Sequence, residues 1–287
     1  VEPERVLLGA DALLNGFEST LPVDEAALTP PADAAPPVHI FEGWLELIGE
    51  QDGGQIQVLR GELGPEYGYL PEFDFEFVQS DEGYLVPVQR GLIIADHPVW
   101  NIILEPGRAW QEAGDGGYTR ASIPFALVPK GGNSSFNGTL TFLFDDQRVS
   151  KVWYQVTQEV STYYRINLWG LLDAVYHPQE VDGADEVRDA FARELEKRYP
   201  TKPIEELAVD YPGVDLSAFG SGVTPEHMSW YGVIIGGMNY VGGCRTRFGI
   251  YPYCESMRAA SFSTAKSAYA SVAMMRLAQK YGPEVPG

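Results

Sequence analysis

The sequence has few basic residues and no long apolar run. It contains 20 lysines and arginines against 40 aspartates and glutamates, giving a formal net charge of -20 at pH 7. A chain of this charge repels phosphate backbones and anionic membrane surfaces, so we expect no nucleic-acid partner. No stretch approaches the roughly 18 to 20 apolar residues that a spanning helix needs, so we expect no membrane span. The acidity itself favours solubility in a salty medium, with specific cation binding as the alternative.

Cysteine is nearly absent as well. The two cysteines, Cys244 and Cys254, fall in one short segment, GGCRTRFGIYPYC. Two thiols that enclose a loop containing glycine and proline predict a local disulfide, which forms in an oxidising compartment. This favours a periplasmic or secreted protein. The alternative is a pair of reduced, half-buried thiols in the cytosol.

Histidine is also scarce, with four residues in the chain. They are scattered, with neither a His-x-x-x-His spacing nor a cysteine in a ligand pattern beside them. We therefore expect neither a metal nor another cofactor. A structural or surface role is expected for each of the four: His39, His97, His177 and His227.

The length of 287 residues is enough for two domains, or for one large domain with an extension. Residues 1–37 end in LTPPADAAPP, which indicates a linker or a loosely attached arm. Residues 38–222 form the next unit, mainly β, and carry near their end a helix with the sequence ADEVRDAFARELEKRYP. The glycine- and proline-rich stretch YPGVDLSAFGSGVTPEH then predicts a boundary near residue 222, and residues 223–287 form the last unit.

Short runs of β-branched and aromatic residues, separated by turn signals, occupy residues 38 to about 164. This punctuation is typical of an antiparallel sandwich or an open barrel. Trp100 and Trp153 lie on these runs and Trp110 lies between two of them, and we expect all three to be core rather than a sugar-binding surface. The runs are HIFEGWLELIGE, GQIQVLRGEL, FDFEFVQ, GLIIADH, WNIILEP, ASIPFALVP, GTLTFLFDD and RVSKVWYQVTQE.

The last unit begins with a hairpin signal and ends with a small-residue helix. In MSWYGVIIGGMNYVGGC, the pair Gly236-Gly237 suits a two-residue turn with positive φ. The segment from Ser261 to Tyr281 follows, and from Ala265 onward it is small or apolar on nearly every side. Such a helix is predicted to be buried inside a domain.

Ser263 and Lys266 stand at the start of this helix, three positions apart. At this spacing the two side chains differ by about 60° of azimuth, so the ammonium can approach the hydroxyl on one face. A serine hydroxyl needs a neighbouring base to take its proton as it attacks a carbonyl. A lysine can serve when burial and the positive end of a helix dipole disfavour its charged form. The spacing therefore predicts a nucleophile, Ser263, with Lys266 as its general base.

A hairpin, a connecting segment and then Ser-x-x-Lys opening a helix resembles the start of the transpeptidase-like domain of serine β-lactamases, penicillin-binding proteins and related esterases. The resemblance covers roughly the last 60 residues and is specific around residues 258 to 281. It implies that Ser263 is the acylated serine and Lys266 its lysine. The later motifs of the family, a Tyr-x-Asn or Ser-x-Asn element and a Lys-x-Gly or His-x-Gly strand, are expected past Gly287.

These observations together predict an α+β protein. A mainly antiparallel β domain would precede an incomplete β-lactamase-like domain that carries the hairpin and the nucleophile helix. The expected reaction is acyl transfer to Ser263 from a small-molecule or peptide substrate bearing an ester, amide or β-lactam, with these 287 residues alone inactive. The alternatives are a non-catalytic binding module for a saccharide or protein partner, or a degenerate hydrolase homologue. The oligomeric state is left open.

Overall fold

The computed structural model describes residues 8–31, 33–48 and 54–282. The β content dominates, with an 11-stranded sheet, a 3-stranded sheet and a 2-stranded sheet. Four α-helices, α1 (Ala10–Asn15), α2 (Ala184–Lys197), α3 (Leu207–Asp210) and α4 (Thr264–Tyr281), accompany them in the described ranges. The expected β-rich α+β class, with a mainly antiparallel sheet, is confirmed.

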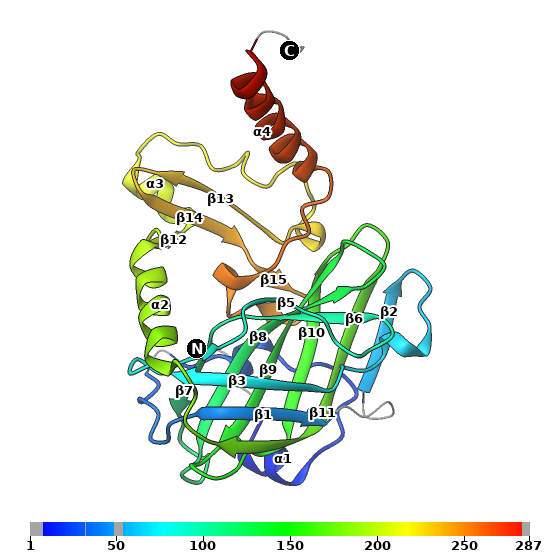
Figure 1. Cartoon of the computed structure of the whole chain (residues 1–287), viewed down its shortest axis with the longest axis vertical. Coiled ribbons are helices and arrows are strands. Elements are labelled where there is room, and N and C mark those ends of the chain that lie inside the picture. The colour runs from blue at the N-terminus through cyan, green and yellow to red at the C-terminus, as the bar shows by residue number, and fades with distance from the viewer. Residues whose placement is uncertain (1–7, 32, 49–53, 283–287) are drawn as a thin grey trace.

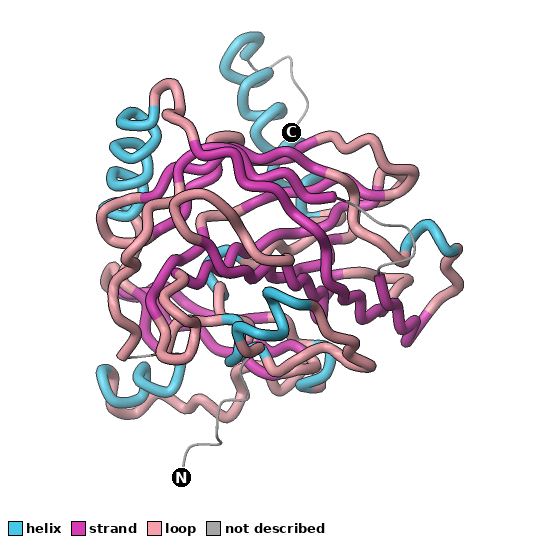
Figure 2. Tube along the Cα trace, turned by 90° about the horizontal axis from the view of Figure 1, so that it is seen from below, coloured by secondary structure: helices cyan, strands magenta, loops and turns pink. Residues whose placement is uncertain are grey.

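The strands of the large sheet pair in an order that returns to its starting point. Because β8 pairs with β9 as well as with β7, the strands close into a ring, whereas the sequence predicts a sandwich or an open barrel. Figures 1 and 2 show strands of this ring on opposite sides of the core. In ring order they are β1 (Glu42–Ile48), β3 (Phe73–Gln79), β4 (Tyr84–Pro87), β7 (Gly107–Gln111), β8 (Thr119–Pro129), β9 (Ser135–Phe144), β10 (Val152–Val160) and β11 (Arg165–Pro178).

Three further strands lengthen the barrel wall. β2 (Gly54–Arg60) pairs with the first half of β11, whose second half pairs with β1. β6 (Trp100–Leu104) likewise continues the edge of β8 beyond β7, and β5 (Gly91–Ile93) pairs with β6. Long strands that change partner along their length let the sheet curl round its core.

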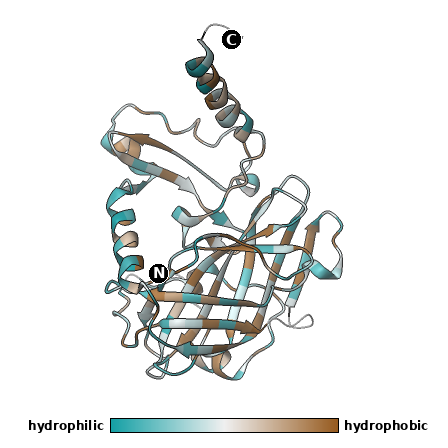
Figure 3. Cartoon of the chain, viewed as in Figure 1, coloured by the Kyte–Doolittle hydropathy of each residue, from teal (hydrophilic) through white to brown (hydrophobic). Residues whose placement is uncertain are grey.

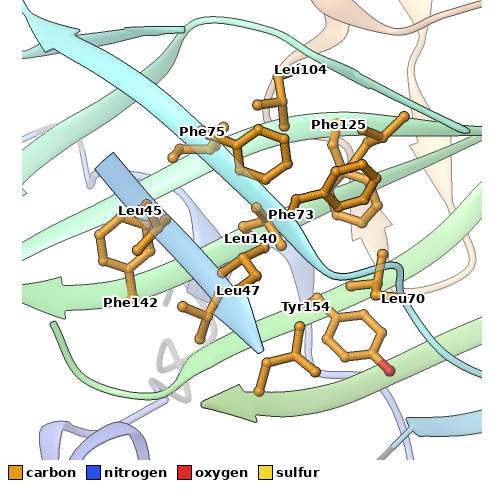
Figure 4. Packing of buried hydrophobic residues seen from close by; sticks show 14 of the residues in the cluster. Leu45, Leu47, Leu70, Phe73, Phe75, Leu104, Phe125, Leu140, Phe142 and Tyr154 are labelled. Carbon is orange, nitrogen blue, oxygen red and sulfur yellow. The ribbon is translucent and has the colours of Figure 1, made fainter. Parts of the chain in front are cut away.

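Alternating apolar residues fill the barrel. On β1, Leu45 and Leu47 are buried while Glu46 between them is half-buried, which is the period-2 pattern of a strand with one face inward. Figure 4 shows these leucines facing Leu140 and Phe142 across the interior. Aromatic rings make much of this core. The fully buried rings include Phe41, Phe77, Phe125, Phe136, Phe142, Phe144, Trp100 and Tyr154.

The arm that precedes the barrel is packed, although its composition suggests a loose attachment. Leu13 and Leu28 are fully buried against Trp153 and Trp169 on the outer face of the barrel. The buried guanidinium of Arg120 also donates from Nη2 to the carbonyl of Leu8 at 2.8 Å. Both faces of β9 and of most of β10 are covered, so that even polar side chains on them, such as Asn137, Thr139 and Gln155, are buried.

A second, smaller body lies beyond one end of the barrel (Figure 1). Its sheet has the order β12 (Thr201–Pro203), β14 (Met238–Gly243) and β13 (Trp230–Ile235). The predicted hairpin is confirmed: Ile235 pairs with Met238, and Gly236 and Gly237 have φ of 60° and 82°. Positive φ at both turn positions suits glycine and matches the strand twist.

A disulfide-bearing segment joins the two bodies. The sulfur atoms of Cys244 and Cys254 lie at disulfide distance, as predicted, with Cα atoms 5.5 Å apart. Between them, the short strands β15 (Arg245–Thr246) and β16 (Gly249–Ile250) pair with each other. Tyr251 then donates its hydroxyl to the carbonyl of Gly138 at 2.8 Å, so the loop is fastened to β9.

None of the helices in the described ranges combines the length and the apolar character needed to cross a bilayer.

Candidate functional site

Ser263 lies at the first turn of α4. Its backbone already has helical φ and ψ of -75° and -7°, and its carbonyl accepts the amide of Lys266 at 3.0 Å. The carbonyl of Ser261 accepts the amide of Thr264 at 3.0 Å. A serine in this position commonly caps the helix through its hydroxyl, but Ser263 makes no side-chain cap bond.

The hydroxyl of Ser263 is instead approached by Lys266. The Nζ atom of Lys266 donates to Oγ of Ser263 at 3.4 Å. The same-face geometry expected from the spacing is therefore confirmed. The distance is longer than the 2.6 to 3.2 Å typical of an engaged nucleophile and base.

Both side chains are exposed, and so is the helix that carries them. The expectation of a buried helix is wrong for the described residues. Tyr269, Val272 and Met275 are 80%, 61% and 64% exposed, and α4 projects away from both bodies in Figures 1 and 3. The composition of a helix indicates that it needs an apolar surface to pack on, but not which segment supplies that surface. No described segment supplies it here.

The chain is last held by the barrel at Arg258. The amide of Arg258 donates to Oδ1 of Asn137 at 2.8 Å, and its carbonyl accepts from Ser135 Oγ at 2.7 Å. Its guanidinium forms an ion pair with Glu105. In the described chain, no hydrogen bond joins residues 259–263 to the barrel. Ser263 is thus joined to the barrel by residues 259–262, which follow the firmly held Arg258.

Within the described ranges, no histidine contacts Ser263 or Lys266. His97 is buried and accepts the amides of Val99 and Trp100 at Nδ1, at 3.1 and 3.0 Å. Burial, together with the charge of Lys130, lowers the pKa of His97 to about 4, so it is a neutral structural residue at neutral pH. Among the described residues no group of three histidine, cysteine or carboxylate side chains could hold a metal ion.

The structure contains two clusters of arginine and glutamate that are not predicted from the sequence. In one, Glu105 lies between Arg90 and Arg258; in the other, Glu159 lies between Arg165 and Arg247. Arg258 is 153 positions from Glu105, and Arg247 is 88 positions from Glu159, so only the fold brings these partners together. Three arginines between residues 245 and 258, in a chain poor in basic residues, are the signal that marks this region.

Comparison with known proteins finds no family model, curated protein or solved structure that matches this chain.

Proposed function

We propose that Ser263 and Lys266 are the nucleophile and general base of a serine hydrolase that works by acyl transfer. The observation that carries the proposal is the contact of Lys266 Nζ with Ser263 Oγ at 3.4 Å, at the N-terminal turn of an 18-residue helix. The hydroxyl is not used as a helix cap, so it is available for chemistry. This is also the one Ser-x-x-Lys spacing in the sequence.

The proposed reaction uses the two side chains in turn. Neutral Lys266 takes the proton of the Ser263 hydroxyl as Oγ bonds to the carbonyl carbon of an ester, amide or β-lactam. The tetrahedral intermediate collapses, the bond to the leaving group breaks, and the leaving group receives the proton from Lys266. Water then attacks the acyl-serine with the same assistance, which releases the acid and restores the hydroxyl.

Two requirements of this chemistry are not met by the described residues. The amine must be kept from its charged form by dry surroundings, and the developing oxyanion must be held by hydrogen-bond donors. Because Ser263 and Lys266 are exposed, we expect residues 1–287 alone to be catalytically silent. We expect activity in a form in which further protein covers α4. The disulfide-distance cysteine pair supports a periplasmic or secreted location for that form.

An acylating probe tests the proposal. The complete gene product is treated with a fluorophosphonate or a penicillin-type probe, and covalent labelling is followed by intact mass. Ser263→Ala is compared with Ser261→Ala and Ser267→Ala, which remove neighbouring hydroxyls at the wrong spacing from Lys266. We expect labelling to disappear only in Ser263→Ala, and Lys266→Ala to slow labelling by about 100-fold or more. Equal labelling in Ser263→Ala and the parent would rule out the assignment.

The exposure of α4 favours a second candidate, a non-catalytic binding protein. Its exposed apolar side chains would then serve to dock a partner rather than to complete an active site. A complete gene product that is labelled by neither probe, at Ser263 or elsewhere, supports this candidate.

A further inference from the structure

A small pocket lies where the barrel meets the second body. It occupies about 260 Å³ between the β10–β11 end of the barrel, residues 225–229 and β15. No residue of α4 lines it, so it is separate from the Ser263 site. Its charged lining includes Glu159 and Arg165 from the barrel and Arg245 and Arg247 from the disulfide segment.

The charge of this lining is opposite to that of the protein. Three arginines, Arg165, Arg245 and Arg247, face a single carboxylate, Glu159, among the described lining residues. The chain as a whole carries a formal charge of -20. Arginines gathered round one cavity in so acidic a protein create a local positive field, which concentrates anions there.

Arg247 and Glu159 form the fixed floor of the pocket. Arg247 donates to both oxygens of Glu159, at 2.9 Å from Nη1 and 2.7 Å from Nη2. Its Nε donates to Oδ1 of Asn167 at 2.6 Å. Arg165 places Nε 3.5 Å from the same carboxylate. One negative charge is therefore shared by two guanidinium groups, and a positive charge remains in excess.

Arg245 adds a second uncompensated charge at the same pocket. Its side chain is exposed, and it makes no ion pair or side-chain hydrogen bond with any residue in the described ranges. The terminal nitrogens of Arg165 likewise donate to no described partner. A guanidinium presents paired N–H groups that match the oxygens of a carboxylate, sulfate or phosphate.

We propose that this pocket binds a small oxyanion, held by Arg245 and Arg165 over the Arg247–Glu159 floor. The volume fits such a group or the charged end of a small molecule, and it is below the size usual for drug-sized ligands. Hydrogen bonds between charged partners are the strong ones, so the two arginines are the main source of affinity. Because the site spans the barrel and the second body, an occupant would also hold the two together.

Isothermal titration calorimetry on residues 1–287 tests the site with inorganic phosphate, sulfate and acetate. Ionic strength is held constant with sodium chloride, because screening weakens all charge interactions. We expect saturable binding with one site for at least one of these anions. Arg245→Gln should weaken it by about tenfold or more, and Arg165→Gln should act in the same direction. Arg193→Gln, which removes an exposed arginine of α2 outside the lining, is the matched control and should bind as the parent does.

The anion that binds best distinguishes the ligand chemistry. Stronger binding of phosphate and sulfate identifies a tetrahedral oxyanion, and stronger binding of acetate identifies a carboxylate; either result supports the proposal. Because Arg245 is exposed, its variant should unfold at the same temperature as the parent in the absence of these anions. Failure of all three anions to bind saturably would overturn the proposal, and so would an equal affinity in Arg245→Gln and the parent.

Discussion

Glu25 is a carboxyl group buried where the arm meets the barrel. It lies in the 3-10 helix η1 (Glu25–Leu28), and its side chain is fully buried beside Thr157, which donates its hydroxyl to it. Its amide donates to the carbonyl of Phe248 at 2.8 Å, so the same residue contacts the disulfide segment. Burial raises the pKa of Glu25 to about 7 because the charged form is poorly solvated there; the hydroxyl of Thr157 only partly offsets this.

This pKa predicts how stability varies with pH. The folded-state pKa lies above the unfolded value of 4.5, so the contribution of Glu25 is complete below pH 4.5 and is lost as pH rises to about 7. Glu25→Gln removes the ionisation and keeps an oxygen acceptor for Thr157. We expect the variant to be more stable than the parent at pH 8 by up to about 3 kcal/mol, with a gain that shrinks toward pH 5.

Urea denaturation at several pH values measures this effect. Glu18→Gln, at an exposed position in the same arm, is the control for the loss of one negative charge. A gain in Glu25→Gln that does not change between pH 5 and pH 8 would contradict the account.

Single positions also show how far the sequence predicts the site. The 3-residue spacing of Ser263 and Lys266 correctly predicts that their side chains approach each other. Trp100 and Trp153 are buried as predicted, at 0% and 1% exposure. The predicted burial of Lys266 is wrong, because burial depends on which segment packs against the helix, and the spacing of residues within the helix does not reveal that. The catalytic roles of Ser263 and Lys266 stay predictions.

Among the elements, β11 is the longest strand, and it lies outside the runs predicted from the sequence. Its inner residues, such as Ile166 and Leu172, join the barrel core, while Trp169 on the outer face packs against the arm. With both faces covered, the alternation of apolar and polar residues disappears. The strands β4 and β7, of 4 and 5 residues, also lie outside the predicted runs. The eight runs predicted as strands all contain observed strands, because their turn signals are local.

The helix α4 is predicted to open readily in residues 1–287. It has 18 residues and no buried side chain among them, so tertiary packing does not stabilise it. Isolated helices of this length are only marginally stable in water. Hydrogen exchange should therefore be orders of magnitude faster for its amides than for those of β9, whose residues are all buried.

Mass-spectrometric hydrogen exchange provides this comparison within one sample, with β9 as the internal reference. Protection of residues 264–281 equal to that of β9 would show that the helix is packed, contrary to the described structure. In the complete gene product, the proposal that α4 is covered predicts that its protection rises.

At the scale of the whole molecule, the segment between Cys244 and Arg258 connects the second body to the barrel. Tyr251 and Tyr253 donate their hydroxyls to carbonyls of β9 and β8, at 2.8 and 2.9 Å, and Arg247 binds Glu159 on β10. Tyr251 is separated from its partner Gly138 by 113 positions in the sequence. Contacts over such separations leave no local signal, so this connection could not be predicted from the sequence, and the boundary near residue 222 stays a prediction.

Replacing both cysteines by serine tests that connection. The disulfide closes a loop with a sequence separation of 10, and closure of a loop of this length restricts the unfolded chain by about 3 kcal/mol. We expect Cys244→Ser/Cys254→Ser to lower the free energy of unfolding by this amount in urea denaturation. Reduction of the parent with dithiothreitol should have the same effect and leave the double variant unchanged. An unchanged parent after complete reduction would contradict the role assigned to the pair.

The central claim is that α4 carries a nucleophile at Ser263 activated by Lys266. The most direct measurement is peptide mapping, by mass spectrometry, of the residue acylated when the complete gene product reacts with a fluorophosphonate probe. The account predicts a single adduct on Ser263. An adduct on a different residue, or no adduct after prolonged reaction with this probe and with a penicillin-type probe, would contradict it.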